Sequence, residues 1–392
     1  MNLLKNKLFL LSPIIVLAVV LIFGLTLAPS VKPTPKDLPV AFVNEDKGID
    51  IPNQGKLNMG DKMAAMIEEK TPKESPVKWI EVDSEEEVKR GLDNQEYYAA
   101  LIIPKDFSAK QASLQTPMPS SPEVHIFINQ GMNTMASNVA GQVLNGIVDT
   151  INQHVRTQLL ERYEKQGGTI TTAQASLLVS PITKTATNVN EIGPNSMNGN
   201  APVSLFQPLW MASIAGSVIL FLTVNKLPFA GRKEAVTARF IQVLAGIVLA
   251  LVAGFGLTWI VDLLGVDIPP FTDIALFLTL AFFSFFLMIS AVLSWLGIRG
   301  IPLFILILFF GAPLLAMAPE FMSPFYRDWV YSWLPMRFMV EGLRELMFFG
   351  NGLSWNTPTA VLISIGAVSL VVLGASSFKP SKEKDAASQV EI

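Results

Sequence analysis

The sequence contains no cysteine and only two histidines, His125 and His154. Without cysteine the chain can have no disulfide, no thiolate metal site and no cysteine nucleophile. A zinc site needs three or four ligands, and the two histidines lie in different segments with no ligand pattern beside them. The sequence therefore predicts no metal centre.

Charged residues are scarce as well: they make up 16% of the chain, while 51% of it is hydrophobic. Soluble domains carry about 25% charged residues. The shortage is uneven, because 35–96 is dense in charge whereas 240–298 carries only three charged residues, Asp262, Asp267 and Asp273. This predicts one part in water and another in lipid. The net charge of −3, without a basic stripe among aromatics, argues against a nucleic-acid partner.

Motifs for catalysis are missing from the sequence too. It has no P-loop of the form G-x-x-x-x-G-K-[ST] and no G-x-S-x-G elbow around a nucleophilic serine. We therefore expect no catalytic residues, no cofactor and no enzymatic activity in this chain. Ionisable residues are nearly absent from the apolar segments, which argues against coupling to protons or ions.

Long apolar runs are what the sequence has in abundance. A bilayer core about 30 Å thick needs a helix of about 20 apolar residues. Six segments meet this requirement: 8–28, 205–224, 240–264, 274–296, 301–318 and 357–378. The first run is too long for the core of a usual signal peptide and is followed by Pro29, which favours an uncleaved anchor.

Lysine and arginine near the span ends predict the orientation, because such residues favour the cytoplasmic side. Lys5 and Lys7 place the N-terminus in the cytoplasm, and the basic loop at 225–239 and the lysine-bearing tail at 379–392 then face the same side. The segment 29–204 is thereby expected outside the cytoplasm. The protein is predicted to lie in a bacterial plasma membrane with both termini cytoplasmic.

The segment outside the cytoplasm alternates between strand-like and helix-like patterns, which predicts an α/β domain. Strands are expected at 38–44, 77–82, 97–103 and 123–128, and helices at 59–69 and after a capping box formed by Ser84 and Glu87. The Asn-, Pro- and Gly-rich stretch 180–202 is interpreted as an extended connector that returns to the membrane.

A long helix is predicted from Asn133 to Lys165. Apolar residues recur every four positions along it, and polar residues form a second stripe. The apolar stripe consists of Val139, Val143, Ile147, Ile151 and Val155, and the polar stripe of Asn138, Gln142, Asn145, Asp149 and Asn152. The favoured interpretation is a helix packed on the sheet; the alternative is a helix that lines a dimer interface or a substrate path.

An amphipathic helix is predicted on the outer side of the membrane at 335–349. Arg337, Glu341 and Arg344 are spaced so that both oppositely charged pairs meet on one helical face. The preceding Trp329, Tyr331 and Trp333 are interpreted as an interfacial aromatic belt. Two roles remain open, a surface helix that anchors the fold and a lid at the exit of a substrate path.

Three strings in this order resemble the YhgE/Pip family: PVAFVNEDKG at 39–48, YYAALIIPKDFS at 97–108 and FINQGMNTMASNV at 127–139. The family is grouped with ABC-exporter permeases that have one span, an extracytoplasmic domain and five further spans. The resemblance implies a homodimer or heterodimer of permeases driven by a cytoplasmic ATPase. It also implies that the loop containing Arg232, Lys233 and Glu234 contacts that ATPase.

The predicted fold class is a polytopic α-helical membrane protein of six spans with an inserted extracytoplasmic α/β domain. We expect an anchor at 1–28, the α/β domain at 29–204, a five-span permease domain at 205–378 and a cytoplasmic tail at 379–392. The leading functional hypothesis is export of a hydrophobic or amphipathic substrate, such as a drug, lipid or peptide. The alternative is a cell-surface scaffold without transport, associated with phage reception or secretion.

Overall fold

The computed structural model describes residues 34–379 except 52–54, 71–74, 115, 117, 166, 168 and 227–230, together with 13, 14, 17, 20 and 21. Almost all of the predicted first span and the tail after Lys379 lie outside the described residues. The described chain divides into two compact units. The α/β unit comprises Pro33–Ile192 with Met317–Ser323, and the helical unit comprises Gly193–Ala316 and the chain from Pro324 onward.

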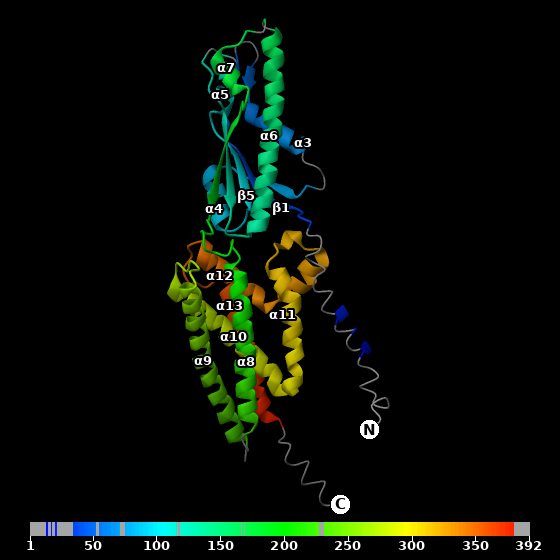
Figure 1. Cartoon of the computed structure of the whole chain (residues 1–392), viewed down its shortest axis with the longest axis vertical. Coiled ribbons are helices and arrows are strands. Elements are labelled where there is room, and N and C mark those ends of the chain that lie inside the picture. The colour runs from blue at the N-terminus through cyan, green and yellow to red at the C-terminus, as the bar shows by residue number, and fades with distance from the viewer. Residues whose placement is uncertain are drawn as a thin grey trace, which may run out of the picture. The chain divides into compact units, whose positions relative to one another are not determined.

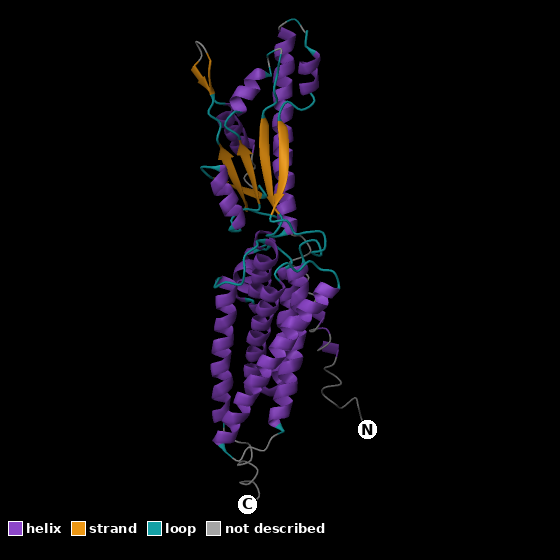
Figure 2. Cartoon of the chain, turned by 90° about the vertical axis from the view of Figure 1, so that its left-hand side faces the viewer, coloured by secondary structure: helices purple, strands orange, loops and turns teal. Residues whose placement is uncertain are grey.

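The α/β unit is built on a five-stranded sheet in the order β4-β1-β5-β6-β7. Its strands are β1 (Leu38–Asn44), β4 (Val77–Glu81), β5 (Ala99–Ile103), β6 (Glu123–Asn129) and β7 (Thr183–Val189). β1 pairs in parallel with β4 and β5, β6 is antiparallel to β5, and β7 is parallel to β6. A separate hairpin joins β2 (Ile49–Ile51) to β3 (Gly55–Leu57). The prediction of an α/β sheet region is confirmed, and Figure 2 shows these strands side by side.

β7 corrects the predicted connector at 180–202, because Thr183–Val189 forms a sheet strand instead. The stretch has no alternating apolar pattern, since threonines and polar residues occupy most of the strand. Its pairing with β6 through seven registered positions supplies the stabilisation that local composition does not indicate.

Short helices surround the sheet: α3 (Met59–Lys70), α4 (Glu85–Asp93), α5 (Phe107–Ser113) and α7 (Thr172–Leu177). Ser84 caps α4, with its hydroxyl accepting from the Glu87 N–H at 3.2 Å, which is one of the two hydrogen bonds of the predicted capping box. The Glu87 carboxylate accepts from Arg90. Val88 and Leu92 of α4 pack on Ala41, Val43 and the neighbouring β5 residues in the core of this unit.

The long helix α6 (Thr134–Lys165) runs along the sheet (Figure 1) and buries one stripe against it. The stripe differs from the prediction, because Ala140, Leu144 and Val148 are buried while Val139, Val143 and Ile147 are only half-buried. A four-residue repeat drifts around a helix that has 3.6 residues per turn, so the residues one position later make the close contact. A Cβ on Gly141 would lie 2.8 Å from Ile128 of β6.

Asn152 was also assigned to the wrong face. It is buried, donating to the Ile182 carbonyl at 2.8 Å and accepting from the Ile182 N–H at 2.7 Å. The side chain thus pairs like a backbone group and holds the chain that enters β7 against α6.

The helical unit contains α8 (Ala201–Asn225), α9 (Arg232–Leu263), α10 (Phe271–Leu296), α11 (Ile301–Leu315), α12 (Pro335–Phe348) and α13 (Thr357–Ala375). Among the described residues, four apolar stretches are long enough to cross a membrane: Ala201–Asn225, Arg232–Leu263, Phe271–Leu315 and Thr357–Phe378. The third contains two predicted spans, α10 and α11, joined by the 3₁₀ turn Gly297–Gly300. The long helices run side by side in both views (Figures 1 and 2).

α10 is the central helix, in contact with α8, α9, α12 and α13. α9 packs on it through small residues spaced four apart, including Gly246, Ala250 and Gly254. A Cβ on Gly246 would lie 2.2 Å from the Phe286 ring, and one on Gly254 would lie 2.6 Å from the Ala275 carbonyl oxygen. Close approach of this kind replaces the hydrophobic effect as the reason for helices to associate in lipid.

Candidate functional site

The charged helix α12 is enclosed by the apolar helices of its unit. Ten of its 14 residues are buried, and the helix contacts α8, α10, α11 and α13. Pro335 starts it at the first turn, where its missing N–H costs nothing. Gly342 is required at the contact with α10, since a Cβ there would lie 2.2 Å from the Phe277 ring. The sequence thus places polar side chains inside an apolar bundle.

The ion pair predicted between Arg337 and Glu341 is present. The Arg337 Nε lies 2.6 Å from the Glu341 Oε1, and both side chains are 28% exposed. The Tyr331 hydroxyl donates to the same carboxylate oxygen at 3.4 Å. The Arg337 guanidinium also lies 4.7 Å from the centre of the Tyr331 ring and 5.3 Å from that of Phe338. One carboxylate therefore orients an arginine and a tyrosine together.

Tyr331 corrects the predicted aromatic belt. Trp329 and Trp333 are 75% and 55% exposed, as a belt requires, but Tyr331 is only 5% exposed. Burial raises the pKa of Tyr331 and Glu341 raises it further, while the charges of Arg337 and Arg344 oppose this. The prediction treated the three aromatic residues as one exposed group. In the helical turns at 325–333, residues two positions apart point to nearly opposite sides, so Tyr331 faces away from Trp329 and Trp333.

Arg344, the third predicted member, is buried at 9% exposed. Glu345, which the prediction omitted, faces the start of α13, where its carboxylate accepts from the Asn356 side chain. Asn356 in turn caps α13 by accepting from the Thr359 N–H at 3.0 Å. Burial raises the pKa of Glu345, the hydrogen bond from Asn356 lowers it and the charge of Glu341 raises it. Glu345 lies four residues after Glu341, on the same side of the helix, and this spacing was the feature of the sequence that could have added it to the predicted site.

The second set of predicted site residues lies at the start of α9. Arg232, Lys233 and Glu234 were expected in a loop at 225–239 that could contain a short helix, and they form the exposed first turn of a 32-residue helix. The GRKEAVTARF string and the apolar run form one continuous helix, because no proline occurs between Gly231 and Leu263. The Arg232 guanidinium lies 6.0 Å from the centre of the Phe378 ring. Their predicted contact with an ATPase stays a prediction.

Two of the sequence strings that carry the family resemblance meet in the α/β unit. Asp46 of NEDKG is 8% exposed and accepts hydrogen bonds from the N–H groups of Gly60 at 2.9 Å and Ser108 at 3.0 Å. The Ser108 hydroxyl, from IIPKDFS, also donates to it and accepts from the Met59 N–H at 2.7 Å. Burial would raise the pKa of Asp46, but these bonds and one from Gly48 hold it below its usual value.

The Asp46 cluster, which is Asp46 with its hydrogen-bonded neighbours Gly60 and Ser108, therefore holds three elements together. It joins the end of β1 to the first turns of α3 and α5. Gly60 has no room for a side chain, because a Cβ would lie 2.2 Å from the Asn44 Oδ1. With each oxygen of Asp46 accepting N–H or O–H donors, the carboxylate serves the fold rather than chemistry.

A second contact in this unit was not foreseen. Glu320, in the connector that follows α11, accepts from the Tyr98 hydroxyl at 2.8 Å through its Oε2. Its carbonyl oxygen accepts from the Lys36 N–H at 3.1 Å. Nearby Ala318 and Phe321 are buried. The connector thus belongs to the α/β unit by its contacts as well as by clustering.

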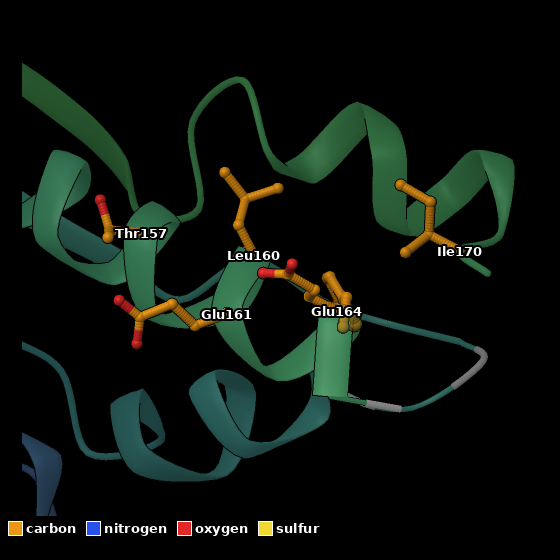
Figure 3. Close-up of a pocket in the computed structure, with 6 residues that line it drawn as sticks. Thr157, Leu160, Glu161, Glu164 and Ile170 are labelled. Atoms are coloured by element: carbon orange, nitrogen blue, oxygen red, sulfur yellow. The ribbon is translucent and has the colours of Figure 1, made fainter. Parts of the chain in front are cut away.

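A hollow of about 410 Å³ lies at the end of α6 and is lined by Thr157, Leu160, Glu161, Tyr163, Glu164 and Ile170 (Figure 3). The Tyr163 hydroxyl donates to the Leu114 carbonyl oxygen at 2.8 Å. Leu160 and Ile170 are 48% and 40% exposed, so the hollow is open to solvent. Among the described residues no group of three His, Asp or Glu side chains is arranged to hold a metal ion.

Comparison with known proteins identifies the family. A family profile described as "Protein of unknown function (DUF3533)" matches residues 7–363. The chain belongs to this family. It is also similar to the "Uncharacterized protein YhgE" of Bacillus subtilis (strain 168), with 26% identity over 132 residues. That match covers 34% of this chain and 16% of the relative, so the chain spans a small part of YhgE.

A solved structure is matched more distantly. It is described as "Crystal structure of a domain of a putative ABC type-2 transporter from Thermotoga maritima MSB8". The match has 16% identity and a TM-score of 0.26, and it covers 38% of this chain and 84% of that one. The YhgE-type resemblance seen in the motifs is thus supported by the relative and the family profile.

Proposed function

We propose that this DUF3533-family protein is a membrane permease subunit that exports a hydrophobic or amphipathic substrate, such as a drug, lipid or peptide. The observation that carries the proposal is the charge network of α12, held inside apolar helices. Half-buried Arg337 and Glu341 would be costly there without a role, because charge is expensive in an apolar bundle. An amphipathic substrate needs such a polar contact beside apolar surface.

Energy for export would come from a separate ATPase, since no nucleotide-binding or catalytic motif is found in the sequence. The exposed Arg232, Lys233 and Glu234 would contact it, and two permease copies or two related permeases would form the transporter. This chain would itself be no enzyme. The simplest alternative for Arg232 and Lys233 is that they only obey the preference of basic residues for the cytoplasmic side.

The topology proposed with this function has six spans in a bacterial plasma membrane, with both termini cytoplasmic. The turn Gly297–Gly300 supports counting α10 and α11 separately, because Gly297 has a φ of +65° that few other residues adopt. Single cysteines test it, as the chain has none of its own. Ser113→Cys should react with an impermeant maleimide in intact cells and Lys233→Cys only after lysis. Labelling of Lys233→Cys in intact cells would exclude this orientation.

The function is tested by purifying the protein after mild crosslinking and searching for a P-loop ATPase. Replacing Gly231–Glu234 with alanines should abolish recovery of the ATPase without changing the amount of protein in the membrane. The matched control is Arg327→Ala with Asp328→Ala, which removes an exposed ion pair elsewhere in the unit. Recovery that is equal in all three proteins would remove the first turn of α9 from the proposal.

The alternative is a cell-surface scaffold without transport. The exposed strand β7, which pairs only with β6 in the described sheet, favours this reading, since an open strand edge is a template for binding another chain. A scaffold would be recovered without an ATPase, and cells lacking it would export amphipathic dyes at the parental rate.

A further inference from the structure

The chain leaves the helical unit for a short detour between α11 and α12. α11 ends at Leu315, and the connector Met317–Ser323 that follows belongs to the α/β unit. From Pro324 onward the chain is again part of the helical unit. A segment that only had to link two helices of one unit would need no contacts with another unit, so this path requires a reason.

The connector is stiff at its centre. The 3₁₀ turn Pro319–Phe321 lies there, and the Phe321 N–H donates to the Ala318 carbonyl oxygen at 3.0 Å. The Met322 N–H donates to the Pro319 carbonyl oxygen at 3.1 Å, and the ring of Pro319 fixes its own φ. A segment held in this way passes a displacement from one end to the other instead of absorbing it.

Glu320 attaches the connector to the rest of the α/β unit at two points. Its Oε2 accepts from the Tyr98 hydroxyl at 2.8 Å, and its carbonyl oxygen accepts from the Lys36 N–H at 3.1 Å. Lys36 lies just before β1 and Tyr98 just before β5, so the two donors come from the starts of neighbouring strands. A carboxylate acceptor makes a hydrogen bond roughly twice as strong as a neutral acceptor does.

Tyr98 is itself fixed by the strands around it. Its N–H donates to the Pro39 carbonyl oxygen of β1 at 3.0 Å, and its carbonyl oxygen accepts from the Asn129 N–H of β6 at 2.9 Å. Tyr98 is also buried. A movement of this end of the sheet therefore carries the Tyr98 hydroxyl with it, and Glu320 follows through the hydrogen bond.

Very little chain lies between the connector and its flanking helices. Ala316 alone separates it from the end of α11, and Pro324 alone separates it from the helical turns at 325–333. One residue spans at most about 3.6 Å, so the ends of these helices must follow the connector. The turns include Tyr331, whose hydroxyl donates to Glu341 of α12 at 3.4 Å. The path from the connector thus reaches the charge network of α12.

We propose that the connector Met317–Ser323 is a strap that couples the sheet of the α/β unit to α12. Glu320 holds the strap, and Tyr98 is the positioning residue that fixes Glu320 to the sheet. Displacement of this end of the sheet is passed through the turns at 325–333 to the pair of Tyr331 and Glu341. The coupling does not depend on the export proposal, because it concerns only how parts of this chain move together.

The test measures backbone amide hydrogen exchange in the full chain, purified in detergent. Tyr98→Phe removes the hydroxyl and keeps the buried ring, and Glu320→Ala removes the acceptor. The matched control is Tyr163→Phe, because the Tyr163 hydroxyl also makes one hydrogen bond in the α/β unit, to the Leu114 carbonyl oxygen at 2.8 Å. Glu320→Gln is a second control, since its amide oxygen still accepts from Tyr98.

We expect amide exchange along the connector to become about tenfold faster in Tyr98→Phe and in Glu320→Ala, because a hydrogen bond to a carboxylate is lost. The amides to follow are those of Lys36, Phe321 and Met322. The first turn of α12 should exchange at least about twofold faster in the same variants, which corresponds to the lower end of typical coupling energies. Both controls should exchange like the parent in all these segments.

Coupling between two sites is reciprocal, so a change in α12 must also reach the connector. Glu341→Ala should therefore speed exchange at Phe321 and Met322. Faster exchange confined to the connector in Tyr98→Phe, with α12 like the parent, would overturn the proposal. Additive effects in the double variant of Tyr98→Phe and Glu320→Ala would also contradict it, because the two side chains would then act separately. Parental exchange at the connector in both single variants would show that this bond does not hold it.

Discussion

The two units of the chain treat buried polar groups in opposite ways. In the α/β unit two buried polar side chains have several partners: Asp46 accepts from three backbone N–H groups, and Asn152 both donates to and accepts from Ile182. In the helical unit several hydroxyls return to their own helix, as Ser213 does to the Leu209 carbonyl oxygen, or stay unpaired, as Ser290 does, while Ser217 is an exception that donates from α8 to the Phe286 carbonyl oxygen of α10. Specific polar contacts thus join elements in one unit and rarely join helices in the other.

The difference follows from what each solvent leaves available. In water, apolar burial already holds the sheet and helices together, and polar fastenings select one arrangement. In lipid the side chains of a helix gain little by leaving the solvent, so association depends on close packing at glycine and alanine. Close packing at Gly246 and Gly254 therefore fixes how helices of the helical unit meet, as the hydrogen bonds of Asp46 fix how elements of the α/β unit meet.

The strongest test of this comparison is Asp46→Ala. It should destabilise the α/β unit by about 3 kcal/mol or more, because the buried N–H groups of Gly60 and Ser108 lose their acceptor. Protease resistance of the unit in the full-length protein measures the effect. The control is the exposed Asp50→Ala, which should change nothing. Equal resistance of both variants would show that the cluster is not a fastening.

The same contrast explains what could be predicted from the sequence. β1 was predicted at its observed bounds because its apolar run ends at a turn signal, and α12 was predicted within one residue because its amphipathic period is strong. β7 was missed because its stabilisation comes from pairing with β6, which no local pattern records. Within the site, Arg337 with Glu341 followed from helix spacing, whereas Glu345 with Asn356 joins two helices.

A matched pair of glycines on α9 tests the other side of the comparison. Gly254→Ala should destabilise the helical unit by about 1–3 kcal/mol, because its Cβ would meet backbone atoms of Ala275 and Thr279 that cannot yield. Gly256→Ala meets nothing within 4 Å and should be neutral or slightly stabilising. Thermal unfolding in detergent measures both. Similar melting temperatures would indicate that α9 does not depend on close approach.

A smaller effect is expected at the Arg337–Glu341 pair, a place where the helical unit resembles the α/β unit. Glu341→Ala leaves the half-buried Arg337 without its carboxylate and should cost about 1–2 kcal/mol in detergent. The swap Arg337→Glu/Glu341→Arg should recover part of this, because the pair can reform while the Tyr331 contacts are lost. If α12 is the exit lid, efflux of an amphipathic dye should fall in Glu341→Ala and recover partly in the swap. Parental efflux in both would reject the lid.

The smallest expected effect is a difference between the two units in how their stability depends on pH. The pKa of Asp46 is below its ordinary value of 3.8, so its stabilisation is full above that value and is lost as the pH falls through the folded pKa. The pKa of Glu345 is above its ordinary value of 4.5, because burial disfavours the charged carboxylate. Its contribution is therefore full below 4.5 and is lost as the pH rises through the folded pKa.

Glu345→Gln stays neutral at every pH and should become increasingly stable relative to the parent as the pH rises from about 4 to about 7. The melting temperature of the helical unit measures this, with the exposed Glu161→Gln as the control that should show no trend. The amide also keeps an oxygen that can accept from Asn356, so loss of the cap of α13 does not confound the comparison. A constant difference between Glu345→Gln and the parent across this range would mean that Glu345 is ionised throughout, and that α12 meets water more freely than its burial indicates.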